Sequence, residues 1–253
     1  MSVLLNKDET NEPIRTGSQP KTPQQGYMNP LYGPQFDFPE WTGPLRTLYI
    51  LGGTPRCGSS MFGTLLFQTG TLGHPQEYFI EPNLTQLHER LGDPVLSRVI
   101  NVRTSPNGVF GIKSHAWQLN EVLTRMYKVP GLPMPRVVVM ERRDIDAQAK
   151  SWALAEATKV YSKIDGYVPM QQVAQPAVVS AETVEQMKTT LLGRKQLWNI
   201  LLQTAYPVHL KIFYEDVLED PQREVNKVAE FLGVEAGAAV DLARIPLKKQ
   251  RQD

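Results

Sequence analysis

A glycine-rich loop between Gly53 and Ser60 has the residue types and spacing to bind an anion. The loop reads Gly-Thr-Pro-Arg-Cys-Gly-Ser-Ser. Its two glycines are spaced as in the nucleotide-triphosphate loop GxxxxGK(S/T), but Ser59 stands where that motif has its lysine. Backbone amides of the loop and of the next helix would still hold a phosphate-like group, and Arg56 would add positive charge. The alternative is a turn that only begins a helix.

A second candidate anion site follows a later apolar run. Arg142 and Arg143 come directly after this run, and Ser151 lies about two helical turns further on. An arginine and a hydroxyl can both bind one monophosphate if the chain folds back between them. If the strand continues through the two arginines, one of them faces the site and the other faces solvent. The alternative is a solvated charge cluster in which Asp144 caps a helix.

The apolar runs predict the elements that hold these residues. Buried strands are expected at 47–51, 136–140 and 208–214, and helices after the loop to about Gly70, at about 144–158 and at 221–232. Strands that alternate with helices favour an α/β class, here a P-loop-like three-layer fold with a central parallel sheet flanked by helices. The polar stretch 161–180 is expected to be a mobile loop over the site.

Composition restricts the class of protein. The chain has 253 residues, of which 41% are hydrophobic and 21% charged, and its net charge is +1. This ordinary globular composition has no basic excess that would indicate nucleic acid as a partner. No apolar run approaches the ~20 residues that cross a bilayer. A single cysteine fits a reducing compartment, so we expect a cytoplasmic protein without a membrane span.

Residues 1–44 stand apart because they hold seven of the twenty prolines. We expect a Pro-rich N-terminal arm there, either a flexible leader or an arm whose aromatic side chains pack on the body or on a partner. Residues 45–253 would then form one domain. No metal is expected in it, because the four histidines do not form a ligand-spaced cluster with Cys57.

Together, the two candidate anion sites and the third strand resemble the superfamily of sulfotransferases that use 3′-phosphoadenosine-5′-phosphosulfate (PAPS). The resemblance spans about residue 47 to the end. The motifs that carry it are the loop 54–60, the pair Arg142 and Ser151, and the run 213–221 with Glu-Phe-Leu-Gly at 230–233. The runs Gly73-His-Pro-Gln-Glu-Tyr-Phe79 and Pro106-Asn-Gly-Val-Phe-Gly-Ile-Lys113 look most similar to the bacterial trehalose sulfotransferase-like subgroup.

This resemblance implies an enzyme, a PAPS-dependent sulfotransferase that transfers a sulfuryl group to a hydroxyl of a small acceptor by in-line displacement. The acceptor would be a carbohydrate or a bacterial metabolite, the product of the donor would be 3′,5′-bisphosphoadenosine, and no metal would be needed. Glu77 would be the general base, and Lys113 and Arg56 the cations near the bridging oxygen. The cofactor-binding residues would be Arg56, Cys57, Gly58, Ser59, Ser60, Arg142, Ser151, Tyr214, Lys249 and Gln250.

Two features depart from the subgroup. His115 stands where the subgroup usually has an apolar residue, and Lys-Ser-His resembles the Lys-Thr-His of eukaryotic cytosolic sulfotransferases, so His115 is a second candidate base. The basic C-terminal segment matches only the start of the subgroup's, so we expect part of the cofactor lid to be missing or replaced by the N-terminal arm. Trp117 and Trp152 either line the acceptor pocket or belong to the core. The resemblance permits a homodimer.

Two other classes of protein remain as alternatives. A P-loop phosphotransferase would need the loop lysine that this chain lacks. A nucleotide-binding protein without catalysis would not need Glu77 and His115, which this chain has.

Overall fold

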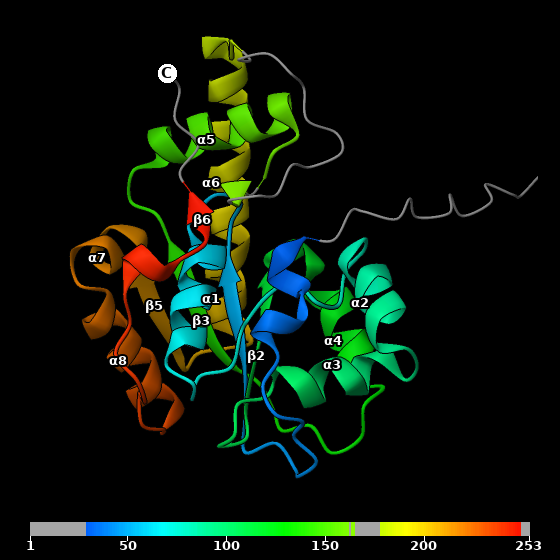
Figure 1. Ribbon diagram of the computed structural model, residues 1–253. Coiled ribbons are helices and arrows are strands. Elements are labelled where there is room, and N and C mark those ends of the chain that lie inside the picture. Colours follow the sequence, from blue (N-terminus) through cyan, green and yellow to red (C-terminus); the bar gives the residue numbers. More distant parts are fainter. Residues whose placement is uncertain (1–28, 162, 165–177, 249–253) are drawn as a thin grey trace, which may run out of the picture.

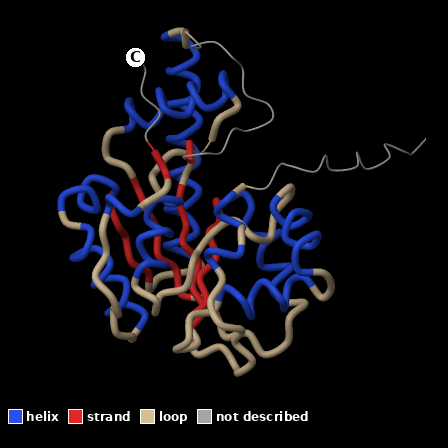
Figure 2. Tube along the Cα trace, in the orientation of Figure 1, coloured by secondary structure: helices blue, strands red, loops and turns tan. Residues whose placement is uncertain are grey.

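A four-stranded parallel sheet forms the centre of the computed structural model, which describes residues 29–161, 163–164 and 178–248. Its strands are β1 (Thr47–Gly53), β2 (Val109–His115), β3 (Arg136–Glu141) and β5 (His209–Phe213), in the order β2-β1-β3-β5 (Figures 1 and 2). The predicted α/β fold with a central parallel sheet flanked by helices is therefore confirmed. β2 is an additional strand that the apolar runs did not predict.

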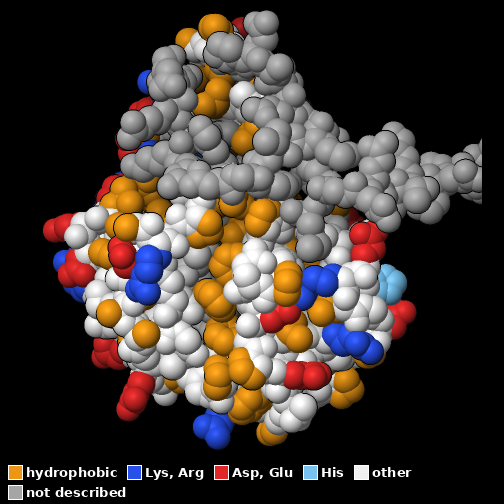
Figure 3. All heavy atoms as spheres, viewed as in Figure 1, with side chains coloured by type: hydrophobic (Ala, Val, Ile, Leu, Met, Phe, Trp, Pro, Cys, Tyr) orange, Lys and Arg blue, Asp and Glu red, His pale blue; other side chains and the backbone are white. Residues whose placement is uncertain are grey.

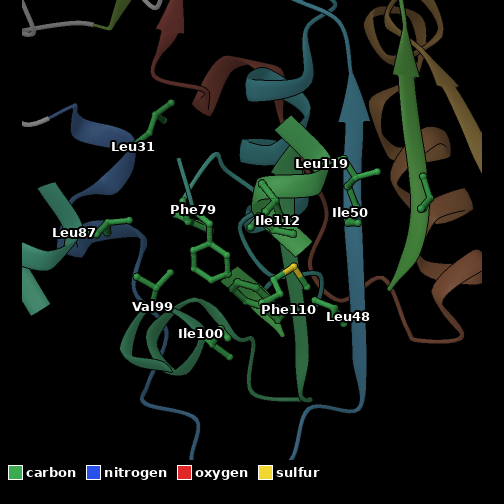
Figure 4. Close-up of a cluster of buried hydrophobic side chains, with 14 of the residues drawn as sticks. Leu31, Leu48, Ile50, Phe79, Leu87, Val99, Ile100, Phe110, Ile112 and Leu119 are labelled. Atoms are coloured by element: carbon green, nitrogen blue, oxygen red, sulfur yellow. The ribbon is translucent and has the colours of Figure 1, made fainter. Parts of the chain in front are cut away.

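Helices cover both faces of this sheet because its side chains alternate. Leu48 and Ile50 of β1 lie in one hydrophobic cluster with α4 (Leu119–Met126) and α6 (Ala181–Thr204), which Figure 4 shows in part. Tyr49 and Leu51 lie in a second cluster with α1 (Ser59–Gln68) and α8 (Pro221–Leu232). Strands buried on both faces carry apolar residues at nearly every position, which is why they were predictable as continuous runs.

The remaining elements surround this core. Helices α2 (Asn83–Leu91) and α3 (Val95–Arg103) lie on the β2 side, while α5 (Ile145–Thr158) and the start of α6 lie together beyond one end of the sheet (Figure 1). The helix predicted at about 144–158 is α5, with Asp144 as its N-cap, and the helix predicted at 221–232 is α8. The third predicted strand was too long, since β5 ends at Phe213 and Tyr214 begins α7 (Tyr214–Glu219). Glu215 of α7 links this helix to the segment between β3 and α5, because its carboxylate accepts hydrogen bonds from the backbone N–H groups of Arg143 and Asp144.

Part of the proline-rich arm packs on the body. Its 3₁₀ turns η1 (Pro30–Tyr32) and η2 (Pro34–Phe36) place Leu31, Tyr32 and Phe36 in the cluster that contains β1. Asp37 then forms ion pairs with Arg90, at 2.6 Å, and with the fully buried Arg103, at 3.3 Å. Residues 1–28 lie outside the described residues, and the division of the chain at residue 44 stays a prediction.

Most of the predicted loop at 161–180 also lies outside the described residues. Its described start includes β4 (Lys163–Ile164), which pairs antiparallel with β6 (Leu247–Lys248). No helix in the described parts of the chain is long and apolar enough to cross a membrane. On the face seen in Figure 3, hydrophobic side chains form a band between scattered charges of both signs.

Candidate active site

A cavity of about 740 Å³ lies where β1, β2 and β3 end, which is the edge at which parallel sheets commonly bind ligands. Its size is typical of small-molecule sites. Every predicted site residue that the structure describes lines it except Cys57: Arg56, Gly58, Ser59, Ser60, Glu77, Lys113, His115, Arg142, Ser151 and Tyr214. Cys57 is fully buried in the core beneath the loop, and Lys249 and Gln250 lie outside the described residues.

The loop conformation depends on Gly58. Its φ of 96° is left-handed, and a Cβ there would meet the Tyr214 ring at 2.5 Å, so only glycine fits without strain. Gln148 of α5 braces the start of the loop, because its Nε2 donates to Thr54 Oγ1 at 2.9 Å and to the Pro55 carbonyl at 2.7 Å. Because Gly58 has no side chain, the ring of Tyr214 packs directly against the loop and forms one side of the cavity.

Helix α1 begins directly after Gly58 with Ser59 and Ser60. The first N–H groups of a helix have no partner within the helix, and the positive end of the helix dipole lies there. Both serines line the cavity, so their amides and hydroxyls are available to an anion in it.

Two arginines meet at the α5 side of the cavity. Arg56 Nε donates to Ser151 Oγ at 3.0 Å, which joins the loop to the helix that follows β3. Burial lowers the pKa of Arg56, and the nearby charge of Arg142 lowers it further. Arg142 lies over the Tyr214 ring at 4.8 Å, and its buried Nε has no hydrogen-bond partner among the described residues. Two like charges and an unsatisfied donor favour a bound anion between them.

Arg142 and its neighbour point in different directions, but β3 ends at Glu141, before both of them, so the expected strand alternation is not the reason. Arg143 forms a bidentate ion pair with Asp216 of α7, and its side chain is 50% exposed. Lys195 of α6 holds the backbone between these two arginines, because its Nζ donates to the Arg142 carbonyl at 2.6 Å. Arg142 is therefore the arginine of this pair that faces the cavity.

Glu77, Lys113 and His115 form a polar cluster on the opposite side. Lys113 and His115 are two residues apart on β2 and so project to the same face. Gln76 pairs with Ile112 at the outer edge of β2, where its carbonyl accepts from Lys113 N at 3.0 Å, and this pairing brings Glu77 beside both side chains. Glu77 Oε2 lies 3.4 Å from Lys113 Nζ, and Oε1 lies 3.2 Å from His115 Nε2.

The electrostatics of this cluster favour the ionised form of Glu77. Burial alone would raise its pKa, but the charge of Lys113 and the hydrogen bond with His115 outweigh burial and hold the pKa at about 2. Lys113 Nζ also donates to Ser60 Oγ at 2.8 Å. The same ammonium group therefore contacts the glycine-rich loop and the carboxylate.

The carbonyl of Gly53 fixes the ring of His115. It accepts from His115 Nδ1 at 2.7 Å, and because a carbonyl oxygen only accepts, Nδ1 carries a hydrogen. Nε2 then faces Glu77, so a hydrogen bond between them requires one more proton, shared by the imidazole and the carboxylate. Trp198 Nε1 donates to the same carbonyl at 3.0 Å, and its ring fills the space that a Cβ on Gly52 would need.

Sequence reasoning missed several residues of the site. Lys150 and Tyr161 line the cavity, and Trp198 lies behind it on α6. Lys150 directly precedes the predicted site residue Ser151 and could have been found from its position next to it. Tyr161 and Trp198 are more than a hundred residues from their partners Arg56 and Gly53, and no local pattern marks them.

Comparison with known proteins assigns the family. A family model for Stf0 sulphotransferases matches residues 48–253, which is most of the chain. The chain belongs to this family. The prediction of the sulfotransferase superfamily is thereby confirmed, and the predicted subgroup agrees with it. No curated protein matches this sulfotransferase.

Three solved structures resemble this sulfotransferase over most of their length. A sulfotransferase domain from the Synechococcus PCC 7002 olefin synthase is 12% identical with a TM-score of 0.46, over 78% of this chain and 76% of that one. A sulfotransferase domain from the curacin biosynthetic pathway is 14% identical with a TM-score of 0.48, over 76% of each chain. A sulfotransferase from Alicyclobacillus acidocaldarius is 16% identical with a TM-score of 0.45, over 78% and 85%. The family assignment rests on the sequence match alone.

Proposed function

We propose that this sulfotransferase uses PAPS as its donor and a hydroxyl of a small molecule as its acceptor. The position of Lys113 carries the proposal, because its Nζ contacts both Ser60 in the phosphate loop, at 2.8 Å, and Glu77, at 3.4 Å. An in-line transfer needs a cation for the leaving oxygen and a base for the attacking hydroxyl within one small volume. Lys113 joins the two groups that would meet these needs.

The donor would bind across the carboxyl end of the sheet. Amides and hydroxyls of Ser59 and Ser60 would hold the 5′-phosphosulfate, and Arg142 with Ser151 would hold the 3′-phosphate. Tyr214, between Gly58 and Arg142, would contact the adenosine. The buried Nε of Arg142 fits such a ligand, because an anion would supply the acceptor that the described residues do not.

Glu77 is the proposed base, and His115 orients it. While Lys113 is its counter-ion, the Glu77 carboxylate is a weak base, since its pKa is about 2. An anion beside Ser60 would offer Lys113 a second counter-ion and so raise the pKa of Glu77. The acceptor hydroxyl would then pass its proton to Glu77 as its oxygen–sulfur bond forms. The bond from sulfur to the bridging oxygen would break, and Lys113 would stabilise the charge on that oxygen.

Calorimetric titration of the full chain with 3′,5′-bisphosphoadenosine, and separately with ATP and magnesium, tests the donor. We expect tight binding of the bisphosphate and no binding of ATP. Radiolabelled PAPS, incubated with the protein and hydroxyl compounds, would then identify acceptors by the label they gain. Binding of ATP alone would overturn the proposal in favour of a phosphotransferase.

A further inference from the structure

An arginine between two tryptophans lies one aromatic ring away from His115 and outside the described lining of the cavity. The guanidinium carbon of Arg194, on α6, lies 3.8 Å from the ring centre of Trp117 and 4.5 Å from that of Trp152. Trp152 is buried on α5, whereas Trp117, in the 3₁₀ turn η3 (Ala116–Gln118), is 42% exposed. Both tryptophans predicted as either acceptor-pocket or core residues thus contact one cation.

Trp117 also contacts His115, the residue that orients the proposed base. The rings of His115 and Trp117 stack with their centres 4.4 Å apart and an angle of 14° between their planes. Trp117 therefore contacts His115 and Arg194, and the guanidinium lies one indole ring away from the imidazole. The described lining of the cavity includes Glu77 and His115 but not Arg194. An acceptor that places a hydroxyl at Glu77 would therefore have to extend out of the cavity, past His115 and Trp117, to meet this cation.

The hydrogen-bonding capacity of Arg194 is unused within the described parts of the chain. An arginine has five N–H donors in one plane, and aromatic contacts engage the flat faces of the group rather than these N–H bonds. No described carboxylate or carbonyl accepts from Arg194. The acidic residue whose charge acts on Arg194 is Glu156. The Glu156 carboxylate already accepts hydrogen bonds from Trp152 Nε1 at 2.9 Å and from Tyr161 OH at 2.8 Å.

The surroundings favour an anion as the ligand. Burial lowers the pKa of Arg194, and the charge of Glu156 opposes this shift without cancelling it. No described carboxylate lies within ion-pair distance of this half-buried guanidinium. A planar guanidinium held at fixed orientation binds carboxylate or phosphate through two parallel hydrogen bonds.

We propose that Arg194, held by Trp117 and Trp152, binds an anionic group of the acceptor, a carboxylate or a phosphate, and so determines which hydroxyl compounds are sulfated. This inference rests on the proposed function, because it takes His115 and Glu77 as the point where the hydroxyl is placed. It commits the acceptor to a class of hydroxyl compounds that carry a negative charge.

Three sugars that differ in one substituent test the inference. The full chain, saturated with 3′,5′-bisphosphoadenosine so that the donor cations are occupied, is titrated with D-glucuronate, D-glucose 6-phosphate and D-glucose. The fluorescence of the four tryptophans, which include Trp117 and Trp152, reports binding, and calorimetry checks the affinities. We expect at least one of the two anionic sugars to bind about tenfold more tightly than glucose or better, and their order distinguishes a carboxylate from a phosphate site.

Variants separate binding from packing. Arg194→Met keeps the stem and should remove the preference for the anionic sugars, while Arg194→Lys keeps the charge without the planar fork and should retain part of it. Lys188→Met removes a charge from the same helix whose partner is Asp146, at 2.7 Å, and not a tryptophan ring, and should leave the three affinities unchanged. Thermal melting confirms that each variant is folded. Equal affinity for all three sugars, no binding of either anionic sugar, or anionic binding that survives Arg194→Met overturns the inference. Failure of the bisphosphate to bind would instead overturn the proposed function.

Discussion

Lys113 and Glu77 form an ion pair in which Nζ lies 3.4 Å from Oε2, and both side chains are largely buried. The pair links the stability of the protein to its proposed chemistry, because the same contact that holds Glu77 ionised also makes it a poor base until Lys113 has another counter-ion.

The stability contributed by Glu77 should depend on pH. Its pKa is about 2 in the folded protein and 4.5 as an ordinary value, so the folded state favours the ionised form. This contribution is present above the ordinary pKa and is lost as pH falls from about 4.5 towards 2. We expect Glu77→Gln to lower the free energy of unfolding by ~1–3 kcal/mol at pH 7. Urea denaturation at pH 7 and pH 3 checks this, and a difference that does not shrink at pH 3 would contradict it.

Substitutions at the two candidate bases should differ in severity. Loss of a general base costs ~100-fold or more in rate, so Glu77→Gln should reduce sulfuryl transfer by that factor while bisphosphate binding persists. His115→Ala should have a smaller effect, because His115 holds Glu77 by one contact at 3.2 Å and leaves the pairing with Lys113 intact. Initial rates with radiolabelled PAPS measure both. The reverse order would identify His115 as the base.

Neighbouring arginines after β3 provide a matched pair for the donor site. Arg142→Ala should weaken bisphosphate binding by ~1.5–3 kcal/mol, the usual contribution of a charge-assisted hydrogen bond. Arg143→Ala removes the same charge but breaks the ion pair with Asp216 and the contact with the Phe213 ring, neither of which lines the cavity, and should leave the affinity nearly unchanged. Calorimetry of the two variants decides, and similar losses would mean that net charge, not a contact, attracts the ligand.

A substitution at Gly58 tests the shape of the loop, and one at Gly193, in α6, is its control. Gly58→Ala forces a Cβ into a left-handed position against Tyr214, which should destabilise the fold by ~1–3 kcal/mol and weaken bisphosphate binding. Gly193→Ala places a Cβ in open space within α6 and should stabilise the protein by ~0.5–1 kcal/mol. Thermal denaturation of both variants gives the comparison. A Gly58→Ala protein as stable as wild type would show that the loop has another accessible conformation.

The buried ion pairs of the N-terminal arm should contribute to global stability. Asp37→Ala leaves Arg103 fully buried with only the Gly33 carbonyl and His74 in reach, which should cost about 3 kcal/mol. Glu121→Ala breaks an exposed pair with Arg125 and should cost less than ~1 kcal/mol. Chemical denaturation measures both. Equal small effects would mean that residues 29–44 detach before the body unfolds.

The parts of this protein that were predictable are those in which neighbouring residues determine the structure. The loop at 53–60 has its glycines at fixed spacing, and β1 and β3 are buried on both faces, so each leaves a local signal. β2 leaves a weaker one, because its second half is Lys-Ser-His and because Gly111 interrupts the apolar run. Gly111 is required there by the Tyr49 ring, which a Cβ would meet at 2.4 Å, and no pattern around residue 111 reveals that contact.

The contacts that complete the site join distant segments. Glu77 reaches Lys113 and His115 only because Gln76 pairs along the edge of β2, which depends on tertiary packing. Likewise, Arg194 and Trp198 lie on a long helix with few buried residues, where Arg194 is one of several charged side chains and Trp198 one of several apolar ones. The family resemblance supplied Glu77, Lys113 and His115 as candidates, whereas it supplied neither Arg194 nor Trp198.

The single carbonyl oxygen of Gly53 has a consequence for how this site can change. It is the last residue of the strand that leads into the loop, and it holds both the imidazole of His115 and the indole of Trp198. Any displacement of the loop is therefore passed on to the imidazole and to α6, and the reverse also holds. The proposed donor-binding loop and the residue that orients the proposed base are thus positioned by the same backbone atom. A substitution that moves one should also move the other. Changes in acceptor specificity are therefore expected in side chains beyond His115.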